Sequence, residues 1–335
     1  MNSRSKSQRA VGLEAVPPRQ NSSRFSGTQI MQTVGMLPVL ILIAIGFQMI
    51  NDRFLSLQNL SIITQQAAIN TVLASGLTLV IIAGGIDLSV GSALAVCAMV
   101  SVAVSLIPGL ESMGLLAGLL AGITLGLING SLITFMRLPP FIVTLGTLTA
   151  YRGIARLIGN ERTLLNPDLP FAFIANQTIF GISPLVIIAA AVVLLSWGIL
   201  RFTVLGMRIY AIGGNESAAR LAGVRVSLVI LFVYIYSGLT AGLGGVMSAA
   251  RLYSANGIQL GQAYELDAIA AVILGGTSFV GGIGSIWGTL VGALIIAVMA
   301  NGLILSGVPD IWQYIIKGGV IIGAVSLDRF RSRTA

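Results

Sequence analysis

The sequence has no histidine, one cysteine (Cys97) and two lysines (Lys6 and Lys317). The missing histidine removes the commonest general base and metal ligand, and a single cysteine cannot form a disulfide framework. Neither lysine follows a glycine-rich phosphate-binding loop, and no cluster of carboxylates or cysteines has metal-ligand spacing. These absences argue against a membrane-embedded enzyme. We expect no catalytic residue, no metal site and no cofactor bound by this chain.

Charge is also scarce, because Asp, Glu, Lys and Arg make up 9% of the 335 residues, against about 25% in soluble domains. Residues 88–110, 112–136 and 226–250 form uncharged runs of 23, 25 and 25 residues, and about 20 apolar residues can cross a bilayer as a helix. Residues 268–309 are too long for one span and contain the break "GGTSFVGGIGS". The sequence predicts an all-α polytopic membrane protein with about ten spans, near residues 34–50, 60–83, 88–107, 113–136, 140–158, 182–200, 227–249, 265–281, 284–305 and 311–327.

The basic residues predict which ends of the spans face the cytoplasm. With the N-terminus inside, thirteen lysines and arginines fall on the cytoplasmic side and five on the outer side, while Lys317 lies within a span. Both termini are therefore predicted to be cytoplasmic. The net charge of +8 then reflects membrane orientation rather than nucleic-acid binding. Residues 1–29 are predicted to be a disordered basic tail, and residues 30–335 a single transmembrane domain.

Glycines recur every four residues in two of the predicted spans. Residues four apart share one helix face, and small residues let helices approach closely in a membrane. We interpret the two series as helix-packing faces, and a substrate path remains the alternative. They are Gly114, Gly118, Gly122, Gly126 and Gly130 in one span, and Gly284, Gly288 and Gly292 in another.

Intramembrane charges are functional candidates by default. Glu265 and Asp267 are predicted at the outer start of the eighth span, and Lys317 early in the tenth. They could form a proton or ion relay in a secondary carrier. The favoured interpretation is structural, with acids in the first turn of a helix and a counter-ion, because acids stabilise the positive end of a helix dipole.

Asp87 is a lone carboxylate in the stretch "AGGIDLSVGS". Gly84 and Gly85 permit a tight reversal before it, at the predicted cytoplasmic end of the second span. Its side chain could then cap free N–H groups of the next helix, at Ser89 or Val90. Capping is the leading hypothesis for Gly85, Asp87 and Ser89, and a role in gating is the alternative.

Residues 201–227 form the longest predicted cytoplasmic loop and contain "GGNESAARLAG". Asn215 fits a helix N-cap, Glu216 the first turn, Arg220 the last turn and Gly223 the position after the helix. Two turns of helix are unstable alone in water, so we expect this short helix to dock against its own protein or a cytoplasmic partner.

Four segments, "SGLTLVIIAGGIDLSVGS", "AIGGNESAARLAGVRV", "YELDAIAAVILGGTSFVGGIGSIWGTLVGALI" and "NGLILSGV", resemble the permease subunit of ribose-type ABC sugar importers. The resemblance runs from about residue 54 to the C-terminus. It implies the ABC importer permease fold, a second permease copy, two cytoplasmic ATPase subunits that use ATP and magnesium, and a periplasmic sugar-binding protein. Asp87 matches the family's signature aspartate. The resemblance also implies that the short helix couples to the ATPase through Gly213, Gly214, Asn215, Glu216, Ala218, Ala219, Arg220, Leu221 and Gly223.

The expected function implied by this resemblance is that of a permease subunit in a bacterial inner membrane, importing a monosaccharide, ribose or a similar sugar. A permease for another aldose, a polyol or a signalling furanose is the main alternative. A proton-coupled secondary carrier using Glu265, Asp267 and Lys317 is the more distant one, and it predicts transport by this chain without an ATPase.

Overall fold

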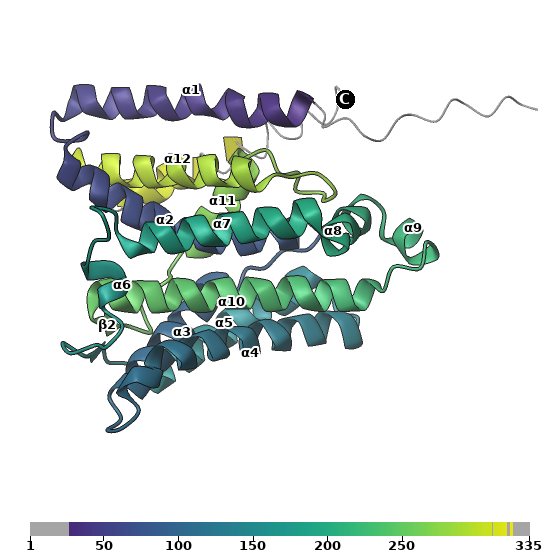
Figure 1. Ribbon diagram of the computed structural model, residues 1–335, viewed down its shortest axis with the longest axis horizontal. Helices are drawn as coiled ribbons and strands as arrows, with labels where there is room; N and C mark the ends of the chain where they lie inside the picture. The colour runs from purple at the N-terminus through teal and green to yellow at the C-terminus, as the bar shows by residue number, and fades with distance from the viewer. Residues whose placement is uncertain (1–26, 310, 320–321, 324–335) are drawn as a thin grey trace, which may run out of the picture.

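The computed structural model describes residues 27–309, 311–319 and 322–323. The predicted tail lies outside the described residues up to position 26, and residues 27–29 already belong to the first helix. Helices run alongside one another between two ends of a bundle (Figure 1). The helices are α1 (Gly27–Ile50), α2 (Leu57–Ile82), α3 (Val90–Ser105), α4 (Gly114–Phe135), α5 (Pro140–Ile158), α6 (Phe173–Asn176), α7 (Pro184–Phe202), α8 (Val204–Gly214), α9 (Glu216–Leu221), α10 (Val226–Leu252), α11 (Tyr264–Leu274) and α12 (Ile286–Leu305).

Most of the described chain is helical. A 3-10 turn, η1 (Glu111–Met113), precedes α4, and residues 311–319 form a further helical segment. Two short strands, β1 (Leu164–Leu165) and β2 (Ser254–Ala255), pair antiparallel with Leu164 opposite Ala255. The predicted all-α fold is confirmed.

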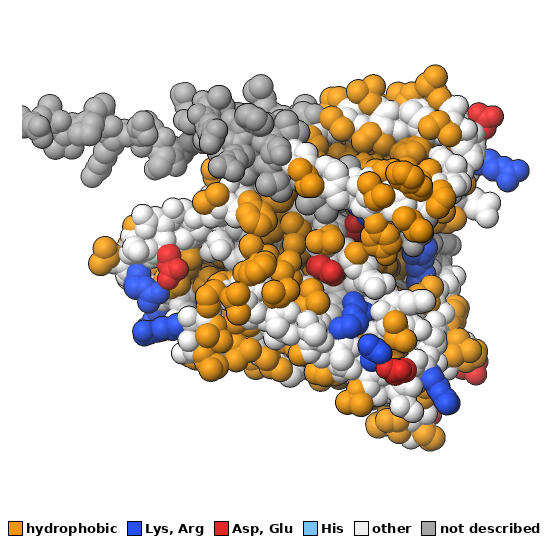
Figure 2. Space-filling model, turned by 180° about the vertical axis from the view of Figure 1, so that it is seen from behind, with side chains coloured by type: hydrophobic (Ala, Val, Ile, Leu, Met, Phe, Trp, Pro, Cys, Tyr) orange, Lys and Arg blue, Asp and Glu red, His pale blue; other side chains and the backbone are white. Residues whose placement is uncertain are grey.

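Within the described ranges, six helices are long and apolar enough to cross a membrane: α2, α5, α7, α10, α12 and Glu111–Phe135, which combines η1 with α4. The count of ten spans stays a prediction. The surface agrees with a membrane setting, because hydrophobic side chains cover much of the face shown in Figure 2. Large apolar side chains point outward from several helices, among them Leu42, Ile142 and Leu195, which are 67%, 58% and 55% exposed. Lipid can solvate such side chains, whereas water cannot do so without cost.

Helix α10 lies at the centre of the bundle. It packs against α4, α3 and α2, and α2 in turn packs against α12 and α7. The side chains between these helices, such as Leu73, Leu94 and Met247, have no exposed surface. The core is therefore built around α2, α3 and α10, and it positions the polar groups described below.

The first glycine series packs α4 against α10, as the helix-packing interpretation expects. A Cβ added at Gly122 would clash with the carbonyl oxygen of Gly238, and one at Gly126 would clash with the carbonyl oxygen of Tyr234. Towards the ends of the same series, Gly114 faces α3, Gly118 lies between α3 and Val246 of α10, and Gly130 faces Leu231 of α10. The two backbones therefore approach each other at distances that only glycine allows.

The second series is only partly helical. Gly288 and Gly292 of α12 lie against the backbone of Gly275 and Ala271, where α12 packs on α11. Gly284 precedes α12 and lies in a loop next to Ile82 and Thr277. Its prediction as part of the helix was wrong by two residues.

The predicted span 265–281 was also wrong, because α11 ends at Leu274. Residues 275–285 form a loop in which Gly276, Gly281 and Gly282 have φ angles of 84°, 99° and 74°. A right-handed helix cannot contain such angles. The uncharged run of sequence therefore extends beyond the end of the helix, and its length gave too long a span.

A second interruption lies between α2 and α3, over residues 83–89. Irregular backbone at membrane depth is tolerated only where protein buries it or a water-filled cavity hydrates it. Here protein buries most of it, because Asp87 and Ser89 are 3% and 1% exposed. Asp87 thus lies in the interior rather than at the membrane surface where its sequence position placed it.

Candidate functional site

The segment between α7 and α10 contains two helices, α8 and α9, whereas the sequence predicted a loop with one short helix. Helix α8 follows α7 after a single residue, Thr203, whose side-chain oxygen accepts a hydrogen bond from Gly206 N at 3.1 Å. This cap explains why α8 begins there, and the sequence analysis did not predict α8. The arginines at positions 201, 208, 220 and 225 all belong to this stretch or flank it. We call this end of the bundle the α9 end, and the charge count predicts that it is cytoplasmic.

Helix α9 has the termini that its sequence predicts. Asn215 is the N-cap, and its Oδ1 accepts a hydrogen bond from Ala218 N at 2.9 Å. At the other end Gly223 has a φ of 83° and donates to Arg220 O, while Val224 donates to Ala219 O. These two bonds form a Schellman motif, which explains why glycine stands at this position.

The outer surface of α9 is open. Ala219 is 5% exposed and attaches the helix to the bundle, whereas Leu221 is 90% exposed. Glu216 and Arg220 form an ion pair at 2.7 Å, with side chains 58% and 63% exposed. A solvated pair of this kind contributes little to folding stability. The exposed leucine and charges therefore form a surface that a partner could contact.

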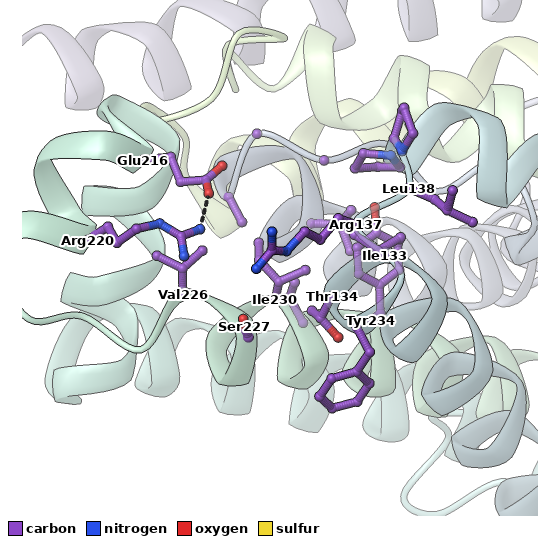
Figure 3. A pocket seen from close by; sticks show the side chains of 18 residues that line it. Ile133, Thr134, Arg137, Leu138, Glu216, Arg220, Val226, Ser227, Ile230 and Tyr234 are labelled. Carbon is purple, nitrogen blue, oxygen red and sulfur yellow. Dashed lines mark hydrogen bonds and ion pairs between the residues drawn. The ribbon is translucent and has the colours of Figure 1, made fainter.

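A cavity of about 820 Å³ lies beside α9. Figure 3 shows it between the Glu216–Arg220 pair on one side and Arg137, from the turn between α4 and α5, on the other. Val226, Ser227 and Ile230 of α10 line it too, and Tyr234 lies at its inner part. Arg137 has a φ of 56°, an uncommon conformation for a residue other than glycine. The cavity thus lies between α9, the C-terminal end of α4 and the N-terminal ends of α5 and α10.

Beyond Tyr234 lies a polar cluster centred on Asp87. Its Oδ1 accepts hydrogen bonds from Ser89 N at 3.0 Å and Ser89 Oγ at 2.6 Å, and its Oδ2 accepts one from Ser237 Oγ at 2.8 Å. Asn129 Nδ2 donates to Ser89 Oγ at 2.8 Å, and Tyr151 OH contacts Asn129 Oδ1 at 3.2 Å. The cluster connects residues 83–89 to α4, α5 and α10.

Ser89 N, one of the two groups named in the capping hypothesis, donates to Asp87, but Ser89 itself is the N-cap of α3, so Asp87 lies two residues before the cap. The bonds to Ser237 and, through Ser89, to Asn129 go beyond a local cap. Gly84 has a φ of 82° and donates to Ile81 O, and Gly85 donates to Val80 O, so α2 ends in a Schellman motif. A Cβ on Gly85 would lie 2.7 Å from Tyr234 OH. Gly85 therefore also allows close packing against α10.

The three predicted intramembrane charges separate into a pair and a single group. Lys317 Nζ and Asp267 Oδ2 form an ion pair at 2.8 Å, with side chains 24% and 16% exposed. Glu265 lies over the first turn of α3, where a Cβ on Gly91 would clash with its Oε2. In Figure 2, acidic and basic side chains interrupt an apolar face of the molecule. The pairing is what a structural counter-ion requires, and no group of three metal-ligating side chains occurs in the described part of the chain.

Ser237, Asn129 and Tyr151 were missed by the sequence analysis. Each is a polar residue inside an apolar helix, 0%, 2% and 3% exposed. The only signal is their polarity, and many serines and threonines in these helices satisfy their hydroxyls on their own backbone, such as Ser248 on Gly244 O. Sequence alone could not select the polar residues that join the Asp87 cluster.

The sequence matches the family described as branched-chain amino acid transport system / permease component over residues 59–325. It is 42% identical over 323 residues to the ribose import permease protein RbsC of Bacillus subtilis (strain 168), covering 95% of this chain and 99% of that protein. It is 39% identical over 296 residues to the D-allose transport system permease protein AlsC of Escherichia coli (strain K12), covering 88% and 90%. It is 36% identical over 317 residues to the galactose/methyl galactoside import permease protein MglC of the same strain, covering 89% and 94%. No solved structure matches the chain significantly.

The matched residues include every helix from α3 to α12 and most of α2, and so contain the Asp87 cluster and α9. The similarity therefore extends over the bundle from α2 to α12, including the Asp87 cluster and α9, rather than over one motif. This multi-span membrane protein belongs to the branched-chain amino acid transport system / permease component family.

Proposed function

We propose that this chain is the membrane permease subunit of an ATP-driven, binding-protein-dependent ABC importer that carries a monosaccharide, ribose or a similar sugar, across the bacterial inner membrane. The observation that supports this most is the 42% identity to a ribose import permease over 95% of the chain. The relatives named for allose and galactose are 39% and 36% identical, which favours a monosaccharide and gives the alternative substrates to test.

In this proposal ATP is hydrolysed by separate subunits and not by this chain. Two permease copies form the pathway, and a periplasmic sugar-binding protein delivers the sugar to its outer end. Two cytoplasmic ATPase subunits bind ATP and magnesium and dock at the α9 end. This proposal agrees with a chain whose only lysines, Lys6 and Lys317, stand in no phosphate-binding loop.

Helix α9 is the proposed contact with the ATPase. Its caps satisfy its own backbone, so its shape does not depend on the partner. Leu221 is 90% exposed, and an exposed leucine next to charged groups is suited to insertion into an apolar groove of another protein. The cavity beside α9 leaves room for the helix to be displaced toward Arg137.

The test is co-purification of the chain with its ATPase in mild detergent, followed by sugar uptake into proteoliposomes supplied with ATP and the binding protein. Leu221→Asp should abolish co-purification without reducing the amount of folded permease. Leu57→Asp is the matched control, because Leu57 is 87% exposed at the far end of the bundle. Equal co-purification of the two variants would rule out α9 as the contact.

Substrate and energy source are tested in the same vesicles. Ribose, allose and galactose should be compared, and uptake should require ATP and be unaffected by collapsing a proton gradient. Uptake by the chain alone under a proton gradient would instead make it a secondary carrier.

A further inference from the structure

Three pieces of backbone from distant parts of the sequence meet at the α9 end. They are the end of α2 with residues 83–85, the end of α8, and the loop of residues 275–285. A Cβ added at Gly213 of α8 would clash with the carbonyl oxygen of Ile82 and lie 2.5 Å from the backbone nitrogen of Gly282. Gly213 therefore lies in direct backbone contact with both interrupted regions of the membrane bundle.

Hydrogen bonds hold this junction together. Gly282 N donates to Ile82 O at 2.9 Å, which links the 275–285 loop to the end of α2. Tyr210 OH, one turn before Gly213 on α8, donates to Gly284 O at 2.9 Å. Helix α8 thus contacts the loop through one side-chain bond and through glycine packing.

Helix α8 is joined to α9 without a flexible linker. Asn215 donates its backbone N–H to Ala211 O at 3.0 Å, which closes α8, and accepts from Ala218 N through its side chain, which opens α9. One residue therefore ends the first helix and begins the second. Gly213 is three residues before Glu216, the first residue of α9, so only a short stretch of chain separates it from α9.

The other side of the junction leads into the membrane. Ile86 O accepts hydrogen bonds from Thr144 Oγ1 at 3.1 Å and from Tyr234 OH at 3.2 Å. The next residue, Asp87, is bonded to Ser89 and Ser237. Residues 83–89 are consequently held at one end by α8 and at the other by α5 and α10.

We propose that Gly213 and Tyr210 are positioning residues that transmit a displacement of α9 to the two helix interruptions, residues 83–89 and 275–285. This inference rests on the proposed function, since it assumes that an ATPase moves α9. Interrupted helices in transporters place irregular backbone along the substrate path. The junction would therefore link the site of ATP-driven movement to the part of the bundle that opens and closes around the sugar.

Two adjacent glycines allow a sharp test. A Cβ on Gly213 meets the backbone of Ile82 and Gly282, whereas a Cβ on Gly214 meets no atom within 4 Å. Both belong to the last turn of α8, so alanine has the same effect on helix propensity at each. Gly213→Ala should separate α8 from the junction by overpacking, and Gly214→Ala should not.

The measurement is the number of sugar molecules taken up per ATP hydrolysed, in proteoliposomes containing the permease, its ATPase and the binding protein. For Gly213→Ala we expect this ratio to fall about tenfold, equivalent to about 1.4 kcal/mol, with ATP hydrolysis retained. For Gly214→Ala we expect the wild-type ratio. A purely structural defect would lower both activities and leave the ratio unchanged.

Tyr210→Phe gives a second, milder variant, because it removes the hydrogen bond to Gly284 O and keeps the ring. Its control is Tyr314→Phe, at a residue that is 50% exposed. A lower ratio for Tyr210→Phe supports the junction even if Gly213→Ala fails to assemble. Wild-type ratios for both Tyr210→Phe and an assembled Gly213→Ala would overturn it. If the unaltered complex showed no ATP-dependent uptake, the proposed function itself would fail, whatever the variants do.

Discussion

Ser237 and Asp87 are 150 residues apart in the sequence, and the serine hydroxyl donates to the buried carboxylate at 2.8 Å. Ser237 lies near the middle of α10, about 17 Å from its first residue at 1.5 Å per residue. The bond therefore attaches the irregular segment between α2 and α3 to the central helix, deep in the bundle. A buried polar group is expensive to leave without a partner, so this contact fixes where the segment can lie.

Ser237→Ala should lower the free energy of unfolding by about 1–3 kcal/mol, because it leaves one oxygen of a buried carboxylate without a donor. The measurement is thermal unfolding of the purified permease in detergent. Ser248→Ala is the matched control, since Ser248 is also buried on α10 but donates only to Gly244 O of its own helix. Equal melting temperatures for the two variants would contradict the anchoring role of Asp87.

Gly122→Ala should destabilise the bundle by about 2 kcal/mol, through overpacking against the backbone of Gly238 and Gly242. The larger Gly122→Leu should reduce folded yield further. In α7, Gly198 has no atom within 4 Å of an added Cβ, so Gly198→Ala should be neutral or stabilising by up to about 1 kcal/mol through helix propensity. Thermal unfolding and yield after detergent extraction distinguish the two. A stable Gly122→Ala protein would show that α4 and α10 can separate freely.

Glu216→Ala and Arg220→Ala should leave stability nearly unchanged, because their ion pair is more than half exposed and such pairs contribute about 0–1 kcal/mol. We expect them to reduce sugar uptake relative to ATP hydrolysis, because both groups lie on the proposed ATPase contact. The control is Arg208→Ala, an exposed arginine on α8. Wild-type uptake by both α9 variants, in fully assembled complexes, would remove these two residues from the coupling surface.

The sequence predicted those structural features that are determined by residues close together in the chain. The N-cap, the charges of both turns and the terminal glycine of α9 all lie between Asn215 and Gly223, and the structure contains each of them. The glycine series of α4 could likewise be read because its period matches a helix face. These features need no knowledge of distant residues.

The remaining features depend on tertiary contacts. Ser237 has no sequence signal that separates it from serines bonded to their own helix. Gly213 and Gly214 are adjacent and identical in type, yet only a Cβ added at Gly213 would meet the backbone of other segments. The early end of α11 was missed because hydropathy does not report the positive φ angles of Gly276, Gly281 and Gly282. Local patterns therefore predicted helix ends and packing faces, but not which polar groups meet inside the bundle.

The Lys317–Asp267 pair provides the last prediction, which separates a structural pair from a relay. Lys317→Met alone should lower the free energy of unfolding by about 1–3 kcal/mol, because it leaves a partly buried carboxylate unpaired. Asp267→Asn with Lys317→Met should recover part of that loss, and a double-mutant cycle on thermal unfolding gives the interaction energy.

Transport decides between the two roles of this pair. If it is structural, the double variant keeps ATP-dependent uptake and shows no response to a proton gradient, because no proton passes through either group. A relay requires the ionisable groups themselves, so the double variant would then lose transport even where its stability is restored. The pair joins α11 to the 311–319 helix and does not touch the junction at Gly213. Loss of uptake in a stable double variant would therefore assign the energy source to the intramembrane charges and remove the reason for an ATPase at α9.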